Sequence, residues 1–298
     1  MRLHRPLLPL VFLLLLLGAC DTEQEAIPAF IQLQPFVVEP TNMAVHGSVS
    51  SKITHGKVFL RDLQTGLTHQ LGTLALPGSY PVLLEGQYEL VVDPVIKANG
   101  NSFSALIYPF YERFSTVVNL EPNVETTVTP RTRYRSDAVF EFIEGFESPV
   151  LVFSDDRDEN PLTFIERSNA DVFEGNYSGH VHLDTANHTM VVSTKSPFTL
   201  DVAQQGRIFL ELDYKTDVQL ELGVIAVDAV GSEEPNFSFV VLEKEEWNKI
   251  YFDLTELVST ANTDRFFIVI RALLSNQTHD PPLTEADVWF DNIKLVHF

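Results

Sequence analysis

The chain has 298 residues, 45% of them hydrophobic, and its 41 acidic against 20 basic residues give a formal net charge of −21. A field of this sign repels nucleic acid and anionic lipid headgroups, so neither is expected as a ligand. There is one cysteine, which excludes an intramolecular disulfide and leaves packing as the source of stability.

Residues 1–19 have the composition of a secretory signal peptide. Arg2 and Arg5 precede an apolar stretch, Leu7 to Leu17, that is too short to span a bilayer. The stretch runs into Leu17-Gly18-Ala19-Cys20, which resembles the lipobox of bacterial lipoproteins. The resemblance implies cleavage between Ala19 and Cys20, and attachment of fatty acids such as palmitate to Cys20. The alternative is an ordinary signal peptide with a cysteine there by chance.

Residues 20–26 form a polar, acidic tether that has too few apolar residues to fold alone. Acidic residues directly after the lipidated cysteine resemble the surface-export signal of Bacteroidota lipoproteins. This resemblance implies a protein anchored in the outer membrane and facing the cell surface. A linker facing the periplasm is the alternative that the sequence leaves open.

The remainder of the chain is expected to be all-β. Short alternating segments are separated by Gly, Pro and Asn, and no amphipathic helical stripe persists. The length after the signal peptide, about 279 residues, predicts two domains. We place a β-sandwich at 27–130, a basic linker at 131–136 and a second β-sandwich at 137–298.

The first domain is predicted from strand-like segments at 30–33, 57–62, 87–92, 116–120 and 126–129. The segment 77–90 resembles a hairpin of the small Ig-like domains found in surface lipoproteins, which implies an Ig-like sandwich. Tyr108-Pro109-Phe110-Tyr111 interrupts the pattern, because proline fits a β-ladder poorly. Tyr108, Phe110 and Tyr111 form either a hydrophobic lid on the sandwich or an exposed contact patch for a partner.

The linker contains the one basic cluster of the chain, Arg131-Thr132-Arg133-Tyr134-Arg135. Residues 136–298 carry 30 acidic and 10 basic residues, whereas residues 27–130 carry 8 acidic and 5 basic residues. We therefore expect a solvated connector whose arginines dock against the acidic second domain.

The second domain resembles galactose-binding-like jelly rolls, the fold of many carbohydrate-binding modules. Four blocks carry the resemblance: 140–147 (FEFIEGFE), 173–183 (FEGNYSGHVHL), 247–255 (WNKIYFDLT) and 287–295 (DVWFDNIKL). This fold hosts many functions, so the resemblance implies no particular ligand. Lipobox, Ig-like domain and jelly roll together resemble a family of two-domain outer-membrane lipoproteins of Bacteroidota.

Two sets of oxygen ligands are candidates for Ca²⁺, which needs six to eight of them. Asp156, Asp158 and Asn160 have D-x-D-x-N spacing, although Pro161 stands where an EF-hand loop has glycine. A solvated acidic loop is the alternative. Separately, the jelly-roll resemblance implies one structural Ca²⁺ held by Glu144, Glu147 and Asp291. No other cofactor is expected.

The aromatic and imidazole residues of the second domain leave two interpretations open. His180 and His182 would share one face of a strand, either as metal ligands or as ordinary surface residues. Trp247 and Trp289 are either core residues or platforms on which a sugar stacks.

No motif for catalysis is present: the sequence has no Gly-x-Ser-x-Gly, no His-Glu-x-x-His and no phosphate loop. We therefore expect no enzyme. The first hypothesis is a lipid-anchored scaffold that binds an outer-membrane protein complex or another envelope protein. The alternatives are a surface lipoprotein that captures glycan and, third, a glycan-active enzyme.

Overall fold

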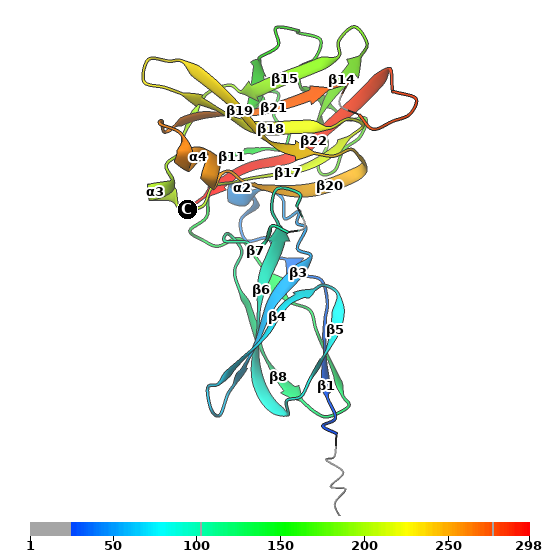
Figure 1. Cartoon of the computed structure of the whole chain (residues 1–298), viewed down its shortest axis with the longest axis vertical. Helices are drawn as coiled ribbons and strands as arrows, with labels where there is room; N and C mark the ends of the chain where they lie inside the picture. Colours follow the sequence, from blue (N-terminus) through cyan, green and yellow to red (C-terminus); the bar gives the residue numbers. More distant parts are fainter. Residues whose placement is uncertain (1–24, 102, 276) are drawn as a thin grey trace, which may run out of the picture.

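The computed structural model describes residues 25–101, 103–275 and 277–298, and it confirms an all-β protein. Figure 1 shows two β-sandwich units that follow one another along the long axis of the molecule. The first unit resembles an Ig-like sandwich and the second a jelly roll, as the sequence predicts. Cys20 and the predicted signal peptide lie outside the described residues, so lipidation stays a prediction.

The first unit consists of two sheets that pack face to face. The strands are β1 (Ala29–Leu33), β3 (His55–Asp62), β4 (Thr68–Ala75), β5 (Gly78–Val82), β6 (Gly86–Lys97), β7 (Ala105–Ile107), β8 (Phe114–Leu120) and β9 (Glu125–Val128). One sheet has the order β5-β1-β9, and the other has the order β4-β3-β6-β7 with β8 also paired to β6. Alternate residues such as Val58, Leu60, Leu90 and Val92 are buried, which is the period that a half-buried strand requires.

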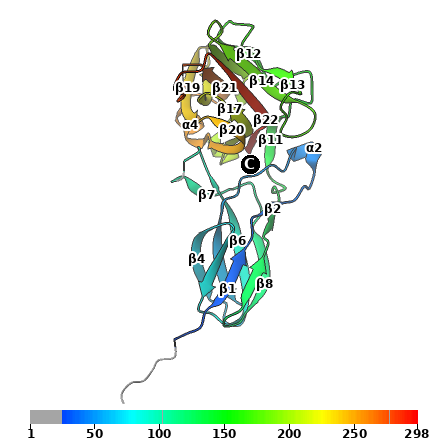
Figure 2. The ribbon, with the colours of Figure 1, turned by 90° about the vertical axis from the view of Figure 1, so that its right-hand side faces the viewer.

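Short elements lie where the two units meet. They are β2 (Val37–Val38), β10 (Arg131–Thr132) and α2 (Met43–His46). Strand β10 runs parallel to β2. Figure 2 shows α2 beside the second unit and β2 at the end of the first unit that faces it.

The second unit consists of two larger sheets. Its strands are β11 (Val139–Glu144), β12 (Phe153–Asp156), β13 (Glu166–Ser168), β14 (Ser178–Asp184), β15 (Thr189–Thr194), β16 (Phe198–Thr199), β17 (Phe209–Thr216), β18 (Leu220–Val227), β19 (Glu233–Val241), β20 (Lys244–Asp253), β21 (Arg265–Leu273) and β22 (Glu285–His297). The order β13-β14-β22-β17-β20, with β11 on β22, makes the first sheet. The order β12-β15-β21-β18-β19, with β16 on β21, makes the second. Two short helices, α3 (Val202–Gln205) and α4 (Thr255–Thr260), close one end.

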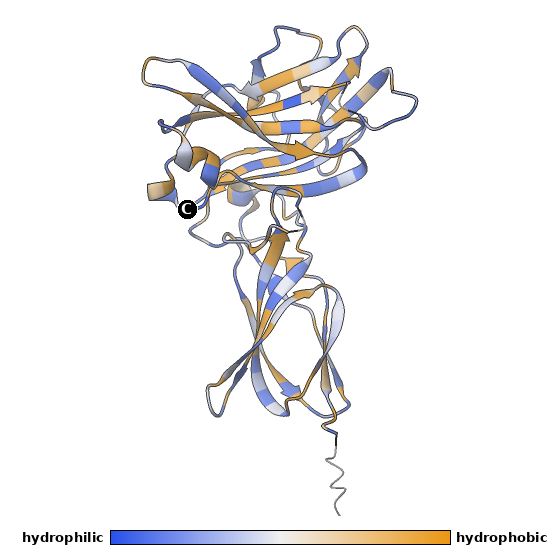
Figure 3. Cartoon of the chain, in the orientation of Figure 1, coloured by the Kyte–Doolittle hydropathy of each residue, from blue (hydrophilic) through white to orange (hydrophobic). Residues whose placement is uncertain are grey.

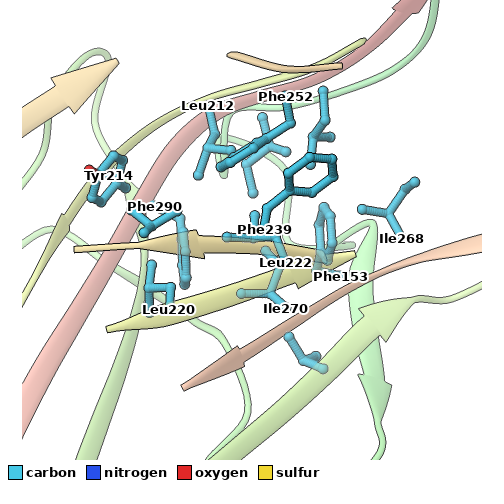
Figure 4. Close-up of a cluster of buried hydrophobic side chains, with 14 of the residues drawn as sticks. Phe153, Leu212, Tyr214, Leu220, Leu222, Phe239, Phe252, Ile268, Ile270 and Phe290 are labelled. Atoms are coloured by element: carbon cyan, nitrogen blue, oxygen red, sulfur yellow. The ribbon is translucent and has the colours of Figure 1, made fainter. Parts of the chain in front are cut away.

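The core of the second unit lies between its two sheets. Figure 4 shows Phe153, Phe252 and Phe290 among aliphatic side chains such as Leu222 and Ile270. Figure 3 shows the hydrophobic residues alternating with hydrophilic ones along many strands. This alternation fixes which residues of β14, β17, β20 and β22 point away from the core and form the outer face of their sheet.

The outward face of β17, β20 and β22 packs partly against the first unit. Tyr108 contacts Phe209 and Tyr251, with ring centroids 5.4 and 5.0 Å apart. At the end of β6, the amide of Asn99 donates to the carbonyl oxygen of Tyr251 (2.7 Å). The two units are therefore joined by an apolar and hydrogen-bonded interface.

The structure corrects the interpretation of Tyr108, Phe110 and Tyr111 as an exposed contact patch. Their exposed fractions are 0%, 0% and 4%. The second unit covers them because rings of this size lower the free energy of folding most when they leave water. Their contact is within the chain, so they offer no surface to a partner.

The basic segment 131–136 is also not a free, solvated connector. Arg131 and Thr132 form β10, and Tyr134 is buried between the units. Arg131 and Arg133 do not reach the acidic second unit as expected, whereas Arg135 does, because its guanidinium lies 5.3 Å from the centroid of the Phe298 ring. Arg131 pairs with Glu39 and Arg133 with Glu112, both in the first unit, while Arg135 pairs with the nearby Asp137. Alternation along the segment places the arginines outward and the tyrosine inward.

Candidate functional site

The candidate site is the part of the outward face of β14, β22, β17 and β20 that the first unit leaves uncovered. Along β22, Ala286, Val288 and Phe290 belong to the core, so Asp287 and Trp289 between them point outward. The strand pairing places His180 and Lys215 on either side of Trp289. We call this surface the platform. It consists of Asp171, Phe173, His180, His182, Lys215, Trp247, Asp287 and Trp289.

One half of the platform is built on Trp289. The ring of His180 stacks on it with centroids 3.9 Å apart and an interplanar angle of 21°. His180 Nε2 and His182 Nδ1 both lie within hydrogen-bond distance of Asp287 Oδ1, at 2.8 and 2.9 Å. The hydrogen bond to Asp287 raises the pKa of His182. Partial burial acts to raise the pKa of Asp287, but the hydrogen bonds from His182 and His180 outweigh it and lower that pKa. Asp287 is therefore a carboxylate at neutral pH.

The other half is built on Trp247. Its indole Nε1 donates to Asp171 Oδ1 (2.8 Å), and Lys215 Nζ donates to Asp171 Oδ2 (2.6 Å). Burial acts to raise the pKa of Asp171, but the bonds from Lys215 and Trp247 outweigh it, so this pKa is lowered. Phe173 packs beside the indole, with ring centroids 5.7 Å apart. Both halves thus combine an aromatic ring with a carboxylate that partners hold in place.

The accessible parts of the platform are the edges around the indoles. The side chains of His182 and Asp287 are 46% and 45% exposed, and Phe173 is 40% exposed. Trp289 is 8% exposed, because His180 covers one face of its ring. A ligand on this surface would therefore meet aromatic carbon together with charged and hydrogen-bonding groups.

A second cluster of ionisable groups lies between the two units and is closed to solvent. Glu211 accepts hydrogen bonds from the hydroxyls of Tyr108 and Tyr134, and Lys249 Nζ lies 3.3 Å from Glu211 Oε2. Burial acts to raise the pKa of Glu211, but Lys249 and Lys294 outweigh it and lower that pKa. Because Glu211 and Lys294 are both 0% exposed, this cluster serves to hold the units together and offers no site for a ligand.

The proposed calcium ligands Glu144, Glu147 and Asp291 are each bound by backbone amides. Glu144 accepts from Phe146 N (2.8 Å), Glu147 from Asn176 N (2.6 Å) and Asp291 from Glu174 N (3.0 Å). Within residues 25–101, 103–275 and 277–298, no group of three His, Cys, Asp or Glu side chains has an arrangement that could hold a metal ion. The contacts favour a structural role for these carboxylates, and calcium binding by them stays a prediction.

Asp156, Asp158 and Asn160 are likewise turned toward the backbone of their own loop. Asp156 accepts from the amide of Asp158 (3.2 Å), Asp158 from that of Asn160 (3.1 Å) and Asn160 from that of Leu162 (3.1 Å). Successive side chains therefore stabilise a series of turns. The contacts favour the structural interpretation of this loop, and calcium binding here stays a prediction.

The sequence left open whether the two tryptophans lie in the core or face outward. The structure places both on the outward face of the sheet, Trp247 half-buried and Trp289 8% exposed. The sequence signal at Trp289 is ambiguous, because Val288-Trp289-Phe290 is a continuous apolar run, and only the burial of Val288 and Phe290 in the core shows that Trp289 lies on the other face of the strand. Alternation likewise places His180 and His182 outward around Val181. Trp247 lies at the start of a long strand, and its sequence neighbours are too polar to show which face is buried.

No family model and no curated protein matches the chain. Among solved structures, the chain is similar to the CBM22-1 xylan-binding domain of Paenibacillus barcinonensis Xyn10C, with 12% identity and a TM-score of 0.37, over 53% of this chain and 94% of that one. It is also similar to the family 11 carbohydrate-binding module of the cellulosomal cellulase Lic26A-Cel5E of Clostridium thermocellum, with 11% identity and a TM-score of 0.38, over 53% and 94% of the two chains. Likenesses this distant carry no argument about function, which rests on the residues of the platform.

Proposed function

We propose that this chain is a non-catalytic, lipid-anchored envelope protein that binds glycan through the platform. The observation that carries the proposal is the outward aromatic pair of Phe173 and the half-buried Trp247, beside the carboxylate of Asp171, which is held in its charged form. Scaffolding of an envelope complex is the alternative, and the aromatic segment that first suggested it is buried within the chain.

The chemistry of the platform matches that of a sugar. A pyranose ring has an apolar face of C–H groups and a rim of hydroxyls. Phe173 and the indole of Trp247 offer aromatic surface to the apolar face of the sugar ring. The carboxylates of Asp287 and Asp171 can accept hydrogen bonds from the sugar hydroxyls, and Lys215 can donate to them.

The polar groups of the platform are fixed before any ligand binds. Asp171 is held by two donors and Asp287 by two imidazoles, so binding orders few side chains. Preorganisation of this kind raises affinity, because each side chain already in place avoids about 0.5–1.5 kcal/mol of lost rotamer freedom.

The position of the N-terminal end of the first unit supports a platform that faces away from the membrane. In Figure 1 the first described residues lie at the end of the first unit that is opposite the second unit. A lipid on Cys20 would therefore attach at the far end from the platform. Among the described residues, no helix has the length and apolar character needed to cross a bilayer. We propose the outer-membrane surface as the location.

The glycan proposal is tested by isothermal titration of the purified chain with xylohexaose, cellohexaose, mannohexaose and an oligogalacturonide. We expect saturable binding of at least one of them, and about tenfold weaker binding after Phe173→Ala or Asp287→Asn, which corresponds to about 1.4 kcal/mol. Phe103→Ala is the matched control, because Phe103 is an aromatic residue that is 97% exposed on the first unit. Equal weakening by the control would exclude the platform, and shortening of the oligosaccharide would contradict a non-catalytic protein.

Anchoring and orientation are tested in cells. Cys20→Ala should move the protein from the membrane fraction to the soluble fraction, and protease added to intact cells should digest the wild-type chain. Retention of the variant in membranes would exclude the lipid anchor. Resistance to the protease would favour the periplasmic face.

A stoichiometric membrane protein recovered after gentle detergent extraction, with no glycan bound in the titration, would favour the scaffold.

A further inference from the structure

A pocket that is distinct from the platform lies at the junction of the two units. It has a volume of about 300 Å³. Its walls come from the edge strands β19 and β20, from the turn after β6, and from the segment 50–54 of the first unit. This volume is at the lower end of the range of about 300–1,000 Å³ that is typical of ligand pockets.

The charge of this pocket is opposite to that of the chain. Lys52, Lys97, Lys244 and Lys249 line it, and none of the lining residues is Asp or Glu. In a chain with 41 acidic and 20 basic residues, carboxylates would be expected around any cluster of lysines.

Three of the four lysines lack a carboxylate partner. Lys249 lies 3.3 Å from Glu211 and 3.7 Å from Asp213, so its charge is compensated. For Lys52, Lys97 and Lys244, the described part of the chain supplies no carboxylate oxygen within 4.0 Å. Lys52 donates instead to the neutral amide oxygen of Asn248.

The lysines act on one another through space. Partial burial, together with the positive charges of Lys244 and Lys97, lowers the pKa of Lys52. Like charges brought together without a counter-charge raise the free energy of the folded state, and a bound anion would relieve this repulsion.

The pocket also has an apolar side. Val240 and Leu242, on the edge strand β19 and its end, are 54% and 58% exposed, and Ile250 lines the wall between the sheets. A ligand that carries carbon beside its anionic group would contact these side chains while the lysines bind the charge.

We propose that this pocket binds an oxyanion, either a free inorganic anion or the acidic group of a sugar. Both sources share a compact group of negatively charged oxygens, which the ammonium groups of Lys52, Lys97 and Lys244 bind through charge-assisted hydrogen bonds. The site is independent of the platform, so either can exist without the other.

The test is isothermal titration of the purified chain at low ionic strength with sulfate, D-glucuronate and, as a neutral probe, D-glucose. We expect saturable binding of at least one anion and none of glucose. Lys244→Gln and Lys97→Gln should each weaken binding at least about fivefold, and added salt should weaken it further. Lys244 is exposed, so its replacement should leave folding intact. Thermal melting of both variants confirms this.

The matched control is Lys195→Gln, because Lys195 is also exposed but lies between β15 and β16, outside the pocket. It should leave binding unchanged. Equal affinity for sulfate and glucuronate identifies a site for free oxyanions, whereas tighter binding of glucuronate identifies an acidic sugar. Absence of binding by both anions, or equal weakening by Lys195→Gln, overturns the proposal.

Discussion

The hydroxyl of Tyr134, in the segment that joins the two units, donates to Glu211 Oε2 on β17 across a distance of 2.8 Å. Both residues are buried, and Lys249 balances the charge of Glu211 from the neighbouring strand β20. A charged carboxylate in such a place tolerates the loss of a donor poorly. This bond therefore ties the orientation of the units to the stability of the whole chain.

Replacement of this donor tests the interface. Tyr134→Phe removes the hydroxyl and keeps the ring, so we expect a loss of about 1–3 kcal/mol in the free energy of unfolding. Chemical denaturation measures this loss. Tyr88→Phe is the control, because Tyr88 is buried in the first unit with no hydrogen bond from its hydroxyl within the described residues. Similar small losses in both variants would show that the bond to Glu211 contributes little.

The carboxyl group of Asp291 makes the free energy of unfolding depend on pH. Burial, with added repulsion from Asp213 and Glu174, raises its pKa to about 7. Between about pH 4 and pH 7 the folded chain keeps a proton that the unfolded chain has released, so stability from this group falls as pH rises through that range. The loss is at most about 4 kcal/mol and is complete above pH 7.

Denaturation of the wild type and of Asp291→Asn at pH 5 and pH 8 measures the effect of Asp291 together with its neighbours Asp213 and Glu174, because more distant groups titrate equally in both proteins. The variant should gain stability relative to the wild type as pH rises. Parallel profiles for the two proteins would mean that Asp291 is not protonated in the folded chain at pH 5.

Gly179 is required by packing at the base of the platform. A Cβ at this position would lie 2.5 Å from ring carbons of Phe146 and 2.9 Å from Ile165. Gly179→Ala should therefore cost about 1–3 kcal/mol of stability through overpacking, measured by chemical denaturation. Gly145→Ala is the matched control, since its Cβ would meet nothing within 4 Å. Equal stability of the two variants would show that Phe146 moves aside at little cost.

The fold was predictable from the sequence because its signals are local. Alternation in segments such as 57–62 and 87–92 marks strands, and turn residues separate them. The interface between the two units was not predictable. The sequence around Tyr108 and Tyr134 is compatible with either a surface or a core position, and their burial is explained only by their partner Glu211 on β17. The platform was predictable in part. Trp289 lies outward because Val288 and Phe290 face the core, and only the strand order β14-β22-β17-β20 brings His180, Lys215 and Trp247 beside it.

Tryptophan fluorescence tests the central claim most directly, because the two tryptophans of the chain are Trp247 and Trp289, and both belong to the platform. We predict that the oligosaccharide bound in calorimetry changes the emission saturably, with the same dissociation constant. Trp247→Phe and Trp289→Phe should each retain part of the change. Calorimetric binding that leaves the emission unaltered, or no binding across the whole set of oligosaccharides, would contradict a glycan site on this surface.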